Sequence, residues 1–443
     1  MNYSRIVQYI ASNYALAFLG FLVSLLTTKF VGPEYFGYVA KIMLYSDWVH
    51  IIILLGLDQS FLRYGMSWSN KRKNEFISEL FIILLIVFAL FCLVYFIFAL
   101  NFVFLLIAIN SFILAISRLL IVYFRVNDSL TKLNLLTTLG LLVTKVVTVI
   151  LFVNDFTVPM VVFFAIVLNG LLLLPFLKKI VFTIKFRINP LIFNKTFLFY
   201  GLLALVSTIF YVFIIGFPVF YLDQKGSVET LGLFNLSVAV VSLLNLGLNG
   251  LKTVFPLIIY KEDKSYLESV GFLHLLAFLC LSFLILNSLL IPVLLTYIDE
   301  KYFGILDYMN LIVLITLNTT VLELFAFNYN KHFKQLLLII ENIAFFIILI
   351  VLFMMNMSSK NTIFLYTCLM AFFAIYRSYV LFGLNWAFLQ RLLVLSLFNS
   401  IMLFDYIFNA FTGYLLWLTS LTFIFYRYGS NFRLWFRQFK FRF

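Results

Sequence analysis

The chain has 443 residues, of which 64% are hydrophobic and only 11% are charged, and its mean hydropathy is +1.11. Soluble domains carry about 25% charged residues, so this composition excludes a soluble globular protein, and an aromatic content of 20% excludes a disordered chain. The net charge of +13 fits the excess of Lys and Arg in the cytoplasmic loops of membrane proteins, so no nucleic-acid partner is expected. The apolar runs are too long for the strands of a β-barrel and indicate an all-α polytopic membrane protein.

Apolar segments that are long enough to cross a bilayer as helices follow one another along the chain. We predict about 14 transmembrane helices, the last two shorter than the others. Their approximate limits are 8–30, 36–57, 76–100, 102–124, 133–153, 158–177, 197–222, 230–258, 269–297, 305–328, 335–356, 361–383, 390–404 and 406–426.

With the predicted helices in this order, the basic residues concentrate on one side of the membrane. If the N-terminus lies inside, the cytoplasmic segments carry most of the cations, whereas the opposite loops hold few cations and several acids. An incorrect helix count would scramble this asymmetry, so we predict that both termini are cytoplasmic. The predicted cytoplasmic cations include Arg63, Lys71, Arg72, Lys73, Arg125, Lys132, Lys178, Lys179, Lys185, Arg187 and Lys195.

The chain shows a weak internal repeat. Glu34-Tyr-Phe-Gly37 opens the second predicted helix and Glu229-Thr-Leu-Gly232 opens the eighth, and both helices end on related strings, Leu55-Gly-Leu-Asp58 and Leu246-Gly-Leu-Asn249. A repeat of six helices keeps both copies in the same orientation, which predicts parallel repeats about an axis normal to the membrane. The expected organisation is two six-helix lobes, 1–177 and 197–383, a basic cytoplasmic linker, 178–196, and a C-terminal helix pair with a basic tail, 384–443.

Ionisable residues inside the predicted spans need an explanation, because each costs about 2.5–3.5 kcal/mol at the centre of a bilayer. Cations outnumber anions among them, so mutual pairing would leave part of the positive charge unmatched. The cations are Lys41, Arg118, Lys145, Lys252 and Arg377, and the anions are Asp47, Glu323 and Glu341, with His50 beside Asp47.

Several of these residues fall on polar stripes at helical spacing. Asn245, Asn249 and Lys252 share one face of the eighth helix. Thr138, Lys145 and Thr148 share a face of the fifth, and Asp47, His50 and Asp58 share a face of the second. Such stripes predict a central hydrated cavity between the two lobes. The alternative interpretation is that Lys41, Arg118 and Arg377 extend to the membrane surface, and that Asp47 and His50 form a structural pair.

Motifs of enzymes and cofactor sites are missing. The sequence contains no nucleotide-binding glycine motif, no H-E-x-x-H and no C-x-x-C, and its three histidines are scattered. No predicted loop is large enough to hold a catalytic domain. We therefore expect a transporter rather than an enzyme, without a cofactor or a metal site.

Two segments resemble a known family. Gly32-Pro-Glu-Tyr-Phe-Gly37 with Leu55-Gly-Leu-Asp-Gln-Ser-Phe-Leu-Arg63-Tyr64, and Val228-Glu-Thr-Leu-Gly-Leu233, are similar to the polysaccharide-transporter family. This family comprises flippases of O-antigen and capsule repeat units within the multidrug/oligosaccharidyl-lipid/polysaccharide exporter superfamily. The chain departs from relatives that carry Asp or Asn midway along the seventh helix, where it has Ile215-Gly-Phe-Pro218.

The resemblance implies a multi-pass protein of the bacterial inner membrane that moves undecaprenyl-pyrophosphate-linked oligosaccharide from the cytoplasmic to the periplasmic leaflet by alternating access. Its expected partners are this lipid-linked substrate, membrane lipids, and the polymerase and chain-length proteins of the same pathway. The expected substrate-binding residues are Lys145, Lys252, Asn245, Asn249, Arg118, Arg377 and Lys41, and the candidates for ion coupling are Glu323, Asp47 and Glu341. A multidrug or organic-cation antiporter of the same fold is the alternative.

Overall fold

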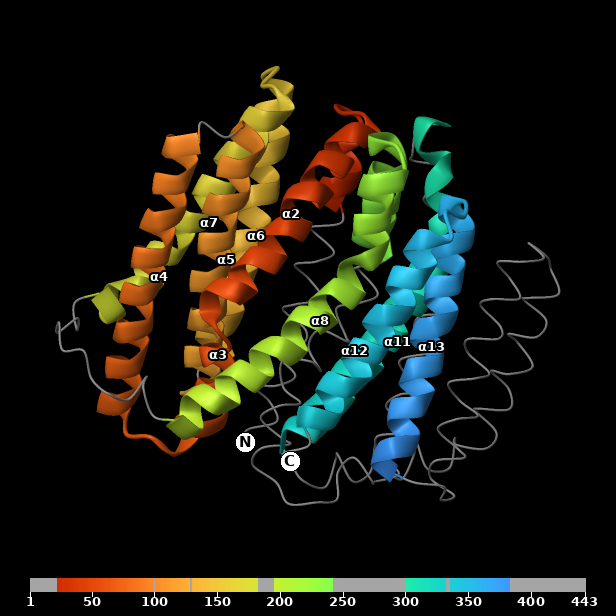
Figure 1. Ribbon diagram of the computed structural model, residues 1–443. Helices are drawn as coiled ribbons and strands as arrows, with labels where there is room; N and C mark the ends of the chain where they lie inside the picture. Colours follow the sequence, from red (N-terminus) through yellow and green to blue (C-terminus); the bar gives the residue numbers. More distant parts are fainter. Residues whose placement is uncertain are drawn as a thin grey trace, which may run out of the picture. The chain divides into compact units, whose positions relative to one another are not determined.

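The computed structural model describes residues 22–98, 101–127, 130–181, 195–241, 300–331 and 335–382. Within these ranges all regular secondary structure is helical and no strand occurs (Figure 1). Seven helices in these ranges are long and apolar enough to cross a membrane. The prediction of an all-α, multi-pass membrane protein is thus confirmed, and the predicted spans within these ranges each coincide with an observed helix.

The described residues divide into two compact units. The first, here called the N-terminal unit, is formed by Ala11–Asn235 with Lys334–Val351. Its elements are α2 (Pro33–Leu54), α3 (Leu57–Tyr64), the 3-10 helix η1 (Gly65–Ser67), α4 (Asn70–Phe98), α5 (Phe102–Val126), α6 (Leu130–Val153), α7 (Val158–Val181), α8 (Lys195–Lys225) and most of α12 (Gln335–Met354). α2 packs against α5 and α8, and α6 packs against α7.

Local signals in the sequence account for where these helices begin. α2 starts with Pro33 directly after Gly32, and proline suits the first helical position because its missing N–H would have no partner there. α5 starts after Asn101, whose side chain accepts a hydrogen bond of 3.0 Å from the Phe104 N–H. This is a typical amino-terminal cap.

The second unit, here called the C-terminal unit, includes the described parts of Leu236–Phe333 and Leu352–Phe443. It contains η2 (Glu300–Ile305), α11 (Leu306–Lys331) and α13 (Ser359–Phe382), and α11 packs along α13. An ion pair of 2.6 Å between Lys360 and Asp307 joins the first turns of these two helices. The predicted lobes 1–177 and 197–383, the linker 178–196 and the helix pair in 384–443 stay predictions, because much of them lies outside the described residues.

The second predicted helix, 36–57, corresponds to α2 and ends at a break just before its predicted limit. α2 ends at Leu54, and Leu55 and Gly56 both adopt left-handed conformations with φ of 52° and 69° before α3 begins. Gly56 also lies against the backbone of α8, where a Cβ would come within 2.8 Å of the Gly201 carbonyl carbon. Glycine is suited to both demands, because it has no Cβ to clash with either its own backbone or a neighbour. The break turns the chain so that α3 runs separately from α2.

The two predicted repeat strings meet in the N-terminal unit. A Cβ on Gly37 would contact Val228 and the Gly232 N–H, and a Cβ on Gly232 would contact Pro33 and the Gly37 N–H. Gly37 therefore lies against Val228 as Gly232 lies against Pro33. These contacts are reciprocal, because Val228 follows Pro33 by the same number of residues as Gly232 follows Gly37. Gly37 lies on α2 and Gly232 on the short helix Val228–Val241. Reciprocal contacts of this kind are expected where two equivalent helices cross at a two-fold axis. The glycines allow the two backbones to touch.

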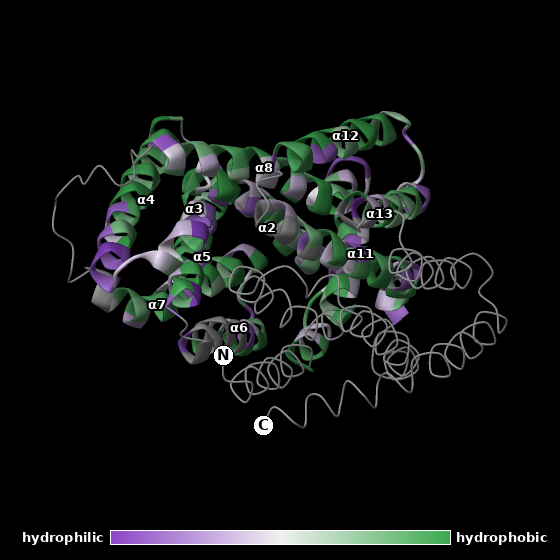
Figure 2. Cartoon of the chain, turned by 90° about the horizontal axis from the view of Figure 1, so that it is seen from below, coloured by the Kyte–Doolittle hydropathy of each residue, from purple (hydrophilic) through white to green (hydrophobic). Residues whose placement is uncertain are grey.

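Lipid-facing surface is recognisable from its hydropathy (Figure 2). Most residues of the described helices are hydrophobic, with hydrophilic residues on α3 and at one end of α4. On α4 the exposed large side chains include Ile86, Leu90 and Ile97, and on α12 they include Leu336, Ile340 and Val351. Apolar side chains that recur every three or four residues on an exposed face are typical of helices that contact lipid. The charged residues discussed below depart from this pattern.

Candidate functional site

The break between α2 and α3 brings an acid and a cation together. Asp58 lies in the first turn of α3, and the Arg118 Nε of α5 donates a hydrogen bond of 3.1 Å to its Oδ2. The Gln59 side-chain amide donates to the same oxygen at 3.1 Å. The Asp58 side chain is 8% exposed and the Arg118 side chain 36% exposed. The carboxylate is thus buried, whereas the guanidinium that pairs with it is partly exposed.

A second ion pair connects α2 with the end of α8. The Lys41 ammonium lies 2.9 Å from Asp223 Oδ1, and the Tyr45 hydroxyl donates to Asp223 Oδ2 at 2.8 Å. The Gln224 amide donates to the same carboxylate at 3.2 Å. Here too the acid is buried, with 5% of its side chain exposed, while the Lys41 side chain is 43% exposed.

Sequence reasoning missed both carboxylate partners. The seventh predicted span ends at residue 222, just before Asp223, whereas α8 continues through Pro218 to Lys225. Asp58 was placed on one stripe with Asp47 and His50, but the break after Leu54 puts it on a different helix. The feature of the sequence that could have indicated a break is Gly56, because glycine readily adopts the left-handed conformation that it has here.

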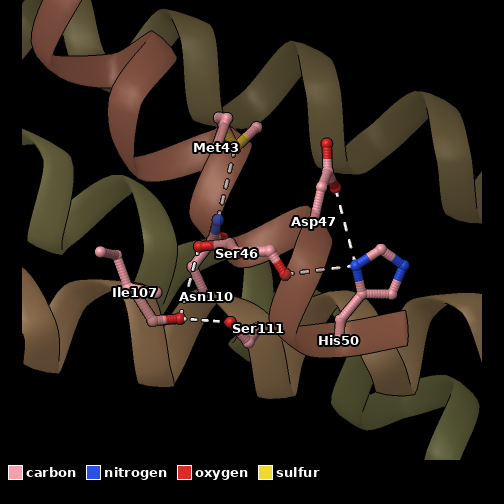
Figure 3. A network of polar contacts seen from close by, with 7 residues as sticks. All are labelled: Met43, Ser46, Asp47, His50, Ile107, Asn110 and Ser111. Atoms are coloured by element: carbon pink, nitrogen blue, oxygen red, sulfur yellow. Dashed lines mark hydrogen bonds and ion pairs between the residues drawn. The ribbon is translucent and has the colours of Figure 1, made fainter. Parts of the chain in front are cut away.

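Asp47 and His50 form a small polar network on α2 (Figure 3). The His50 Nδ1 lies 3.7 Å from Asp47 Oδ1 and 3.3 Å from the Ser46 carbonyl oxygen. The Ser46 hydroxyl donates to the Ile107 carbonyl of α5 at 3.3 Å, which anchors this turn of α2. The Asp47 side chain is 52% exposed, and His50 only 14%. Asp47 is therefore a carboxylate that is both within a span and accessible.

Lys145 occupies a separate position on α6. Its ammonium lies 3.1 Å from the Ser24 hydroxyl, and its side chain is half-buried. One turn away, Thr148 donates to the Thr144 carbonyl at 2.9 Å, and the Thr144 hydroxyl also lies 2.6 Å from Asn169 Oδ1 of α7. The α6–α7 interface is therefore polar at Thr144, whereas Lys145 contacts Ser24.

The remaining predicted site residues within the described ranges are more enclosed. Arg377 on α13 is 2% exposed; its guanidinium donates to the Leu322 carbonyl of α11 at 3.1 Å and lies 6.0 Å from the Tyr329 ring centre. Glu323 on α11 is half-buried, and Glu341 on α12 is 4% exposed. Arg377 and Glu323 belong to the C-terminal unit, and Glu341 to the N-terminal unit.

Three predicted substrate-binding residues, Lys252, Asn245 and Asn249, lie outside the described residues. Within the described ranges, the structure brings Lys41 and Arg118 each to a buried carboxylate, and it does not bring Lys145, Arg377 or the predicted coupling acids into those pairs. No group of three His, Cys, Asp or Glu side chains in these ranges is placed to hold a metal ion.

Comparison with known proteins does not assign this chain to a family. No family model matches the chain, and no curated protein matches it. A similar solved structure is the inward-facing conformation of a multidrug resistance MATE family transporter of the MOP superfamily. It is 12% identical, with a TM-score of 0.47, over 88% of this chain and 95% of that one. The functional assignment therefore depends on the residues of this chain.

Proposed function

We propose that this protein is a flippase that moves an anionic lipid-linked oligosaccharide, of the undecaprenyl-pyrophosphate class, from the cytoplasmic to the periplasmic leaflet of a bacterial inner membrane by alternating access. One observation carries the proposal. In the two interhelical ion pairs described above, Lys41–Asp223 and Arg118–Asp58, the carboxylate is buried and the cation is partly exposed. The chain therefore presents positive hydrogen-bond donors, rather than acids, at these two positions.

The chemistry of a pyrophosphate matches this arrangement. Arg118 donates to Asp58 through Nε, and its planar guanidinium has further N–H groups that can bind two phosphate oxygens at once. A buried carboxylate behind the cation orients it and reduces the cost of holding it within a span. Attraction between a cation and a phosphate is stronger where little water is present. The hydroxyl and amide groups around Lys145 and Thr144 are suited to the neutral sugar hydroxyls.

A direct binding measurement tests this proposal. The purified full-length chain in detergent is titrated with undecaprenyl pyrophosphate and with ethidium, an organic cation. We expect Arg118→Gln to weaken the binding of undecaprenyl pyrophosphate about tenfold or more, because a charge-assisted hydrogen bond contributes about 1.5–3 kcal/mol. Because Arg118→Gln alone leaves Asp58 buried without its cation, the double variant Arg118→Gln/Asp58→Asn is measured as well, and it should lose affinity to the same extent.

Lys132→Gln serves as the matched control, since it also removes one positive charge and Lys132 is exposed near the start of α6. It should bind as the unaltered protein does. Tight binding of ethidium, together with unchanged pyrophosphate binding in the Arg118 variants, would contradict the flippase proposal. That result would instead favour the organic-cation antiporter, for which the exposed carboxylate of Asp47 is the supporting observation.

A further inference from the structure

A cluster of stacked aromatic rings lies at one end of the N-terminal unit. Trp68 of the α3–α4 connection stacks on Phe197 of α8 with ring centres 5.7 Å apart, and Phe76 of α4 packs edge-on against Phe197 at 5.1 Å. Tyr64 and Tyr200 meet at 5.7 Å. The cluster, called here the aromatic platform, consists of Phe61, Tyr64, Trp68, Phe76, Phe197 and Tyr200.

Two guanidinium groups lie over rings of the aromatic platform. The Arg72 Cζ lies 4.6 Å from the Trp68 ring centre, and the Arg63 Cζ lies 4.9 Å from the Tyr200 ring centre. A guanidinium that stacks on an aromatic face is held by the ring and keeps its N–H groups available at the edge. The Trp68 ring therefore positions the Arg72 guanidinium.

The charge around the platform is positive and has little acid to balance it. Lys71, Arg72 and Lys195 are exposed. In the part of the chain that the structure describes, none of these three cations forms an ion pair. This includes pairs with Glu75, the acid one turn further along α4. An anion that approaches this surface would not have to displace a carboxylate.

The platform lies where several membrane-spanning helices begin or end. α4 starts at Asn70 and α8 at Lys195, and both are candidate spans. The Lys73 ammonium donates to the Val126 carbonyl at 3.3 Å, which ties the last residue of α5 to the same end. Tryptophan and tyrosine are enriched at the level of lipid headgroups, and lysine and arginine there face the cytoplasmic side. All these segments belong to those predicted to be cytoplasmic.

We propose that the aromatic platform with Arg63, Lys71, Arg72 and Lys195, here called the basic aromatic surface, is a binding site for the headgroups of anionic phospholipids such as phosphatidylglycerol. The phosphate would accept hydrogen bonds from the Arg72 guanidinium and from the ammonium groups of Lys71 and Lys195, while the partly exposed rings of Tyr64 and Trp68 contact the glycerol and the upper acyl chains. The other rings of the platform are buried and support these two: Phe61, Phe76, Phe197 and Tyr200. A lipid is the occupant that fits, because the cations and the rings lie together at the ends of spanning helices. The inference does not depend on which substrate is transported.

Native mass spectrometry of the full-length chain in detergent tests this inference. The protein is titrated with phosphatidylglycerol and, separately, with phosphatidylcholine. We expect phosphatidylglycerol to bind more tightly, and Arg72→Gln to weaken its binding about fivefold, as expected for loss of one cation near an anionic lipid surface. Arg72→Lys keeps the charge but loses the planar stacking, so its affinity should fall between those of Arg72→Gln and the unaltered chain.

Lys132→Gln again removes one charge, from an exposed position outside the basic aromatic surface, and it should leave phosphatidylglycerol binding unchanged. Equal losses in Arg72→Gln and Lys132→Gln would overturn the inference, since only net charge would then matter. Equal affinity for the two lipids would overturn it as well. So would displacement of phosphatidylglycerol by millimolar inorganic phosphate, which would identify a site for free phosphate rather than for a lipid.

Discussion

Alanine at Gly232 should push two crossing helices apart. A Cβ at this position would lie 2.6 Å from the Pro33 carbonyl carbon and 3.1 Å from the Gly37 backbone nitrogen, whereas ordinary contact begins at 3.4 Å. Both neighbours are backbone atoms, so no side chain can rotate away, and the helices must move apart. Overpacking of this kind costs about 1–3 kcal/mol, which exceeds the gain of up to about 1 kcal/mol in helix propensity from glycine to alanine.

Thermal unfolding of the purified protein in detergent measures this effect. Gly232→Ala and Gly37→Ala should both lower the unfolding temperature, because the contacts of the two glycines are reciprocal. Gly140→Ala on α6 is the matched control: its Cβ would meet only Asn169 Oδ1 within 4 Å, at 3.5 Å, so it should be neutral or stabilising. Equal unfolding temperatures for Gly232→Ala and Gly140→Ala would refute the reasoning that the two repeat strings touch through their backbones.

Three further substitutions separate transport roles from structural roles. Lys145→Gln should reduce translocation of lipid-linked oligosaccharide without reducing insertion into the membrane, measured by flipping in proteoliposomes and by yield; translocation at the unaltered rate would remove Lys145 from the site. Arg377→Gln should lower the unfolding temperature and leave affinity for undecaprenyl pyrophosphate unchanged, because Arg377 is 2% exposed and bound to the Leu322 carbonyl; a selective loss of affinity would contradict this expectation. Glu323→Gln should alter the pH or Na⁺ dependence of transport if Glu323 couples an ion, and unchanged dependence would exclude that role.

The helices were predictable from the sequence because the bilayer sets their length and their hydropathy. The predicted spans 102–124 and 158–177 lie within α5 and α7. The errors concern polar ends and breaks. α8 extends beyond residue 222 because Asp223 finds partners in Lys41 and Tyr45, and hydropathy does not register such a pair. The break at Leu55 and Gly56 depends on a close approach to Gly201 from a distant segment.

The candidate site was predictable in its residue types but not in its pairing. Counting charges in the spans identified Lys41 and Arg118, because any cation there must be accounted for. Periodicity on one helix could not find their carboxylate partners, since Asp223 and Asp58 lie on other helices and their pairing depends on tertiary contacts. The sequence also could not show that the acid of each pair is buried while its cation is partly exposed, because side-chain exposure depends on the folded structure.

Flipping of lipid-linked oligosaccharide in proteoliposomes tests the central claim most directly. The full-length chain is reconstituted with undecaprenyl-pyrophosphate-linked oligosaccharide, under a K⁺–valinomycin potential and without a proton or Na⁺ gradient. Moving an anion outward from a negative interior gains about 2.3 kcal/mol per charge per 100 mV, so an inside-negative potential should accelerate outward flipping. Absence of flipping under any potential or ion gradient, combined with movement of ethidium against a proton gradient, would contradict the account.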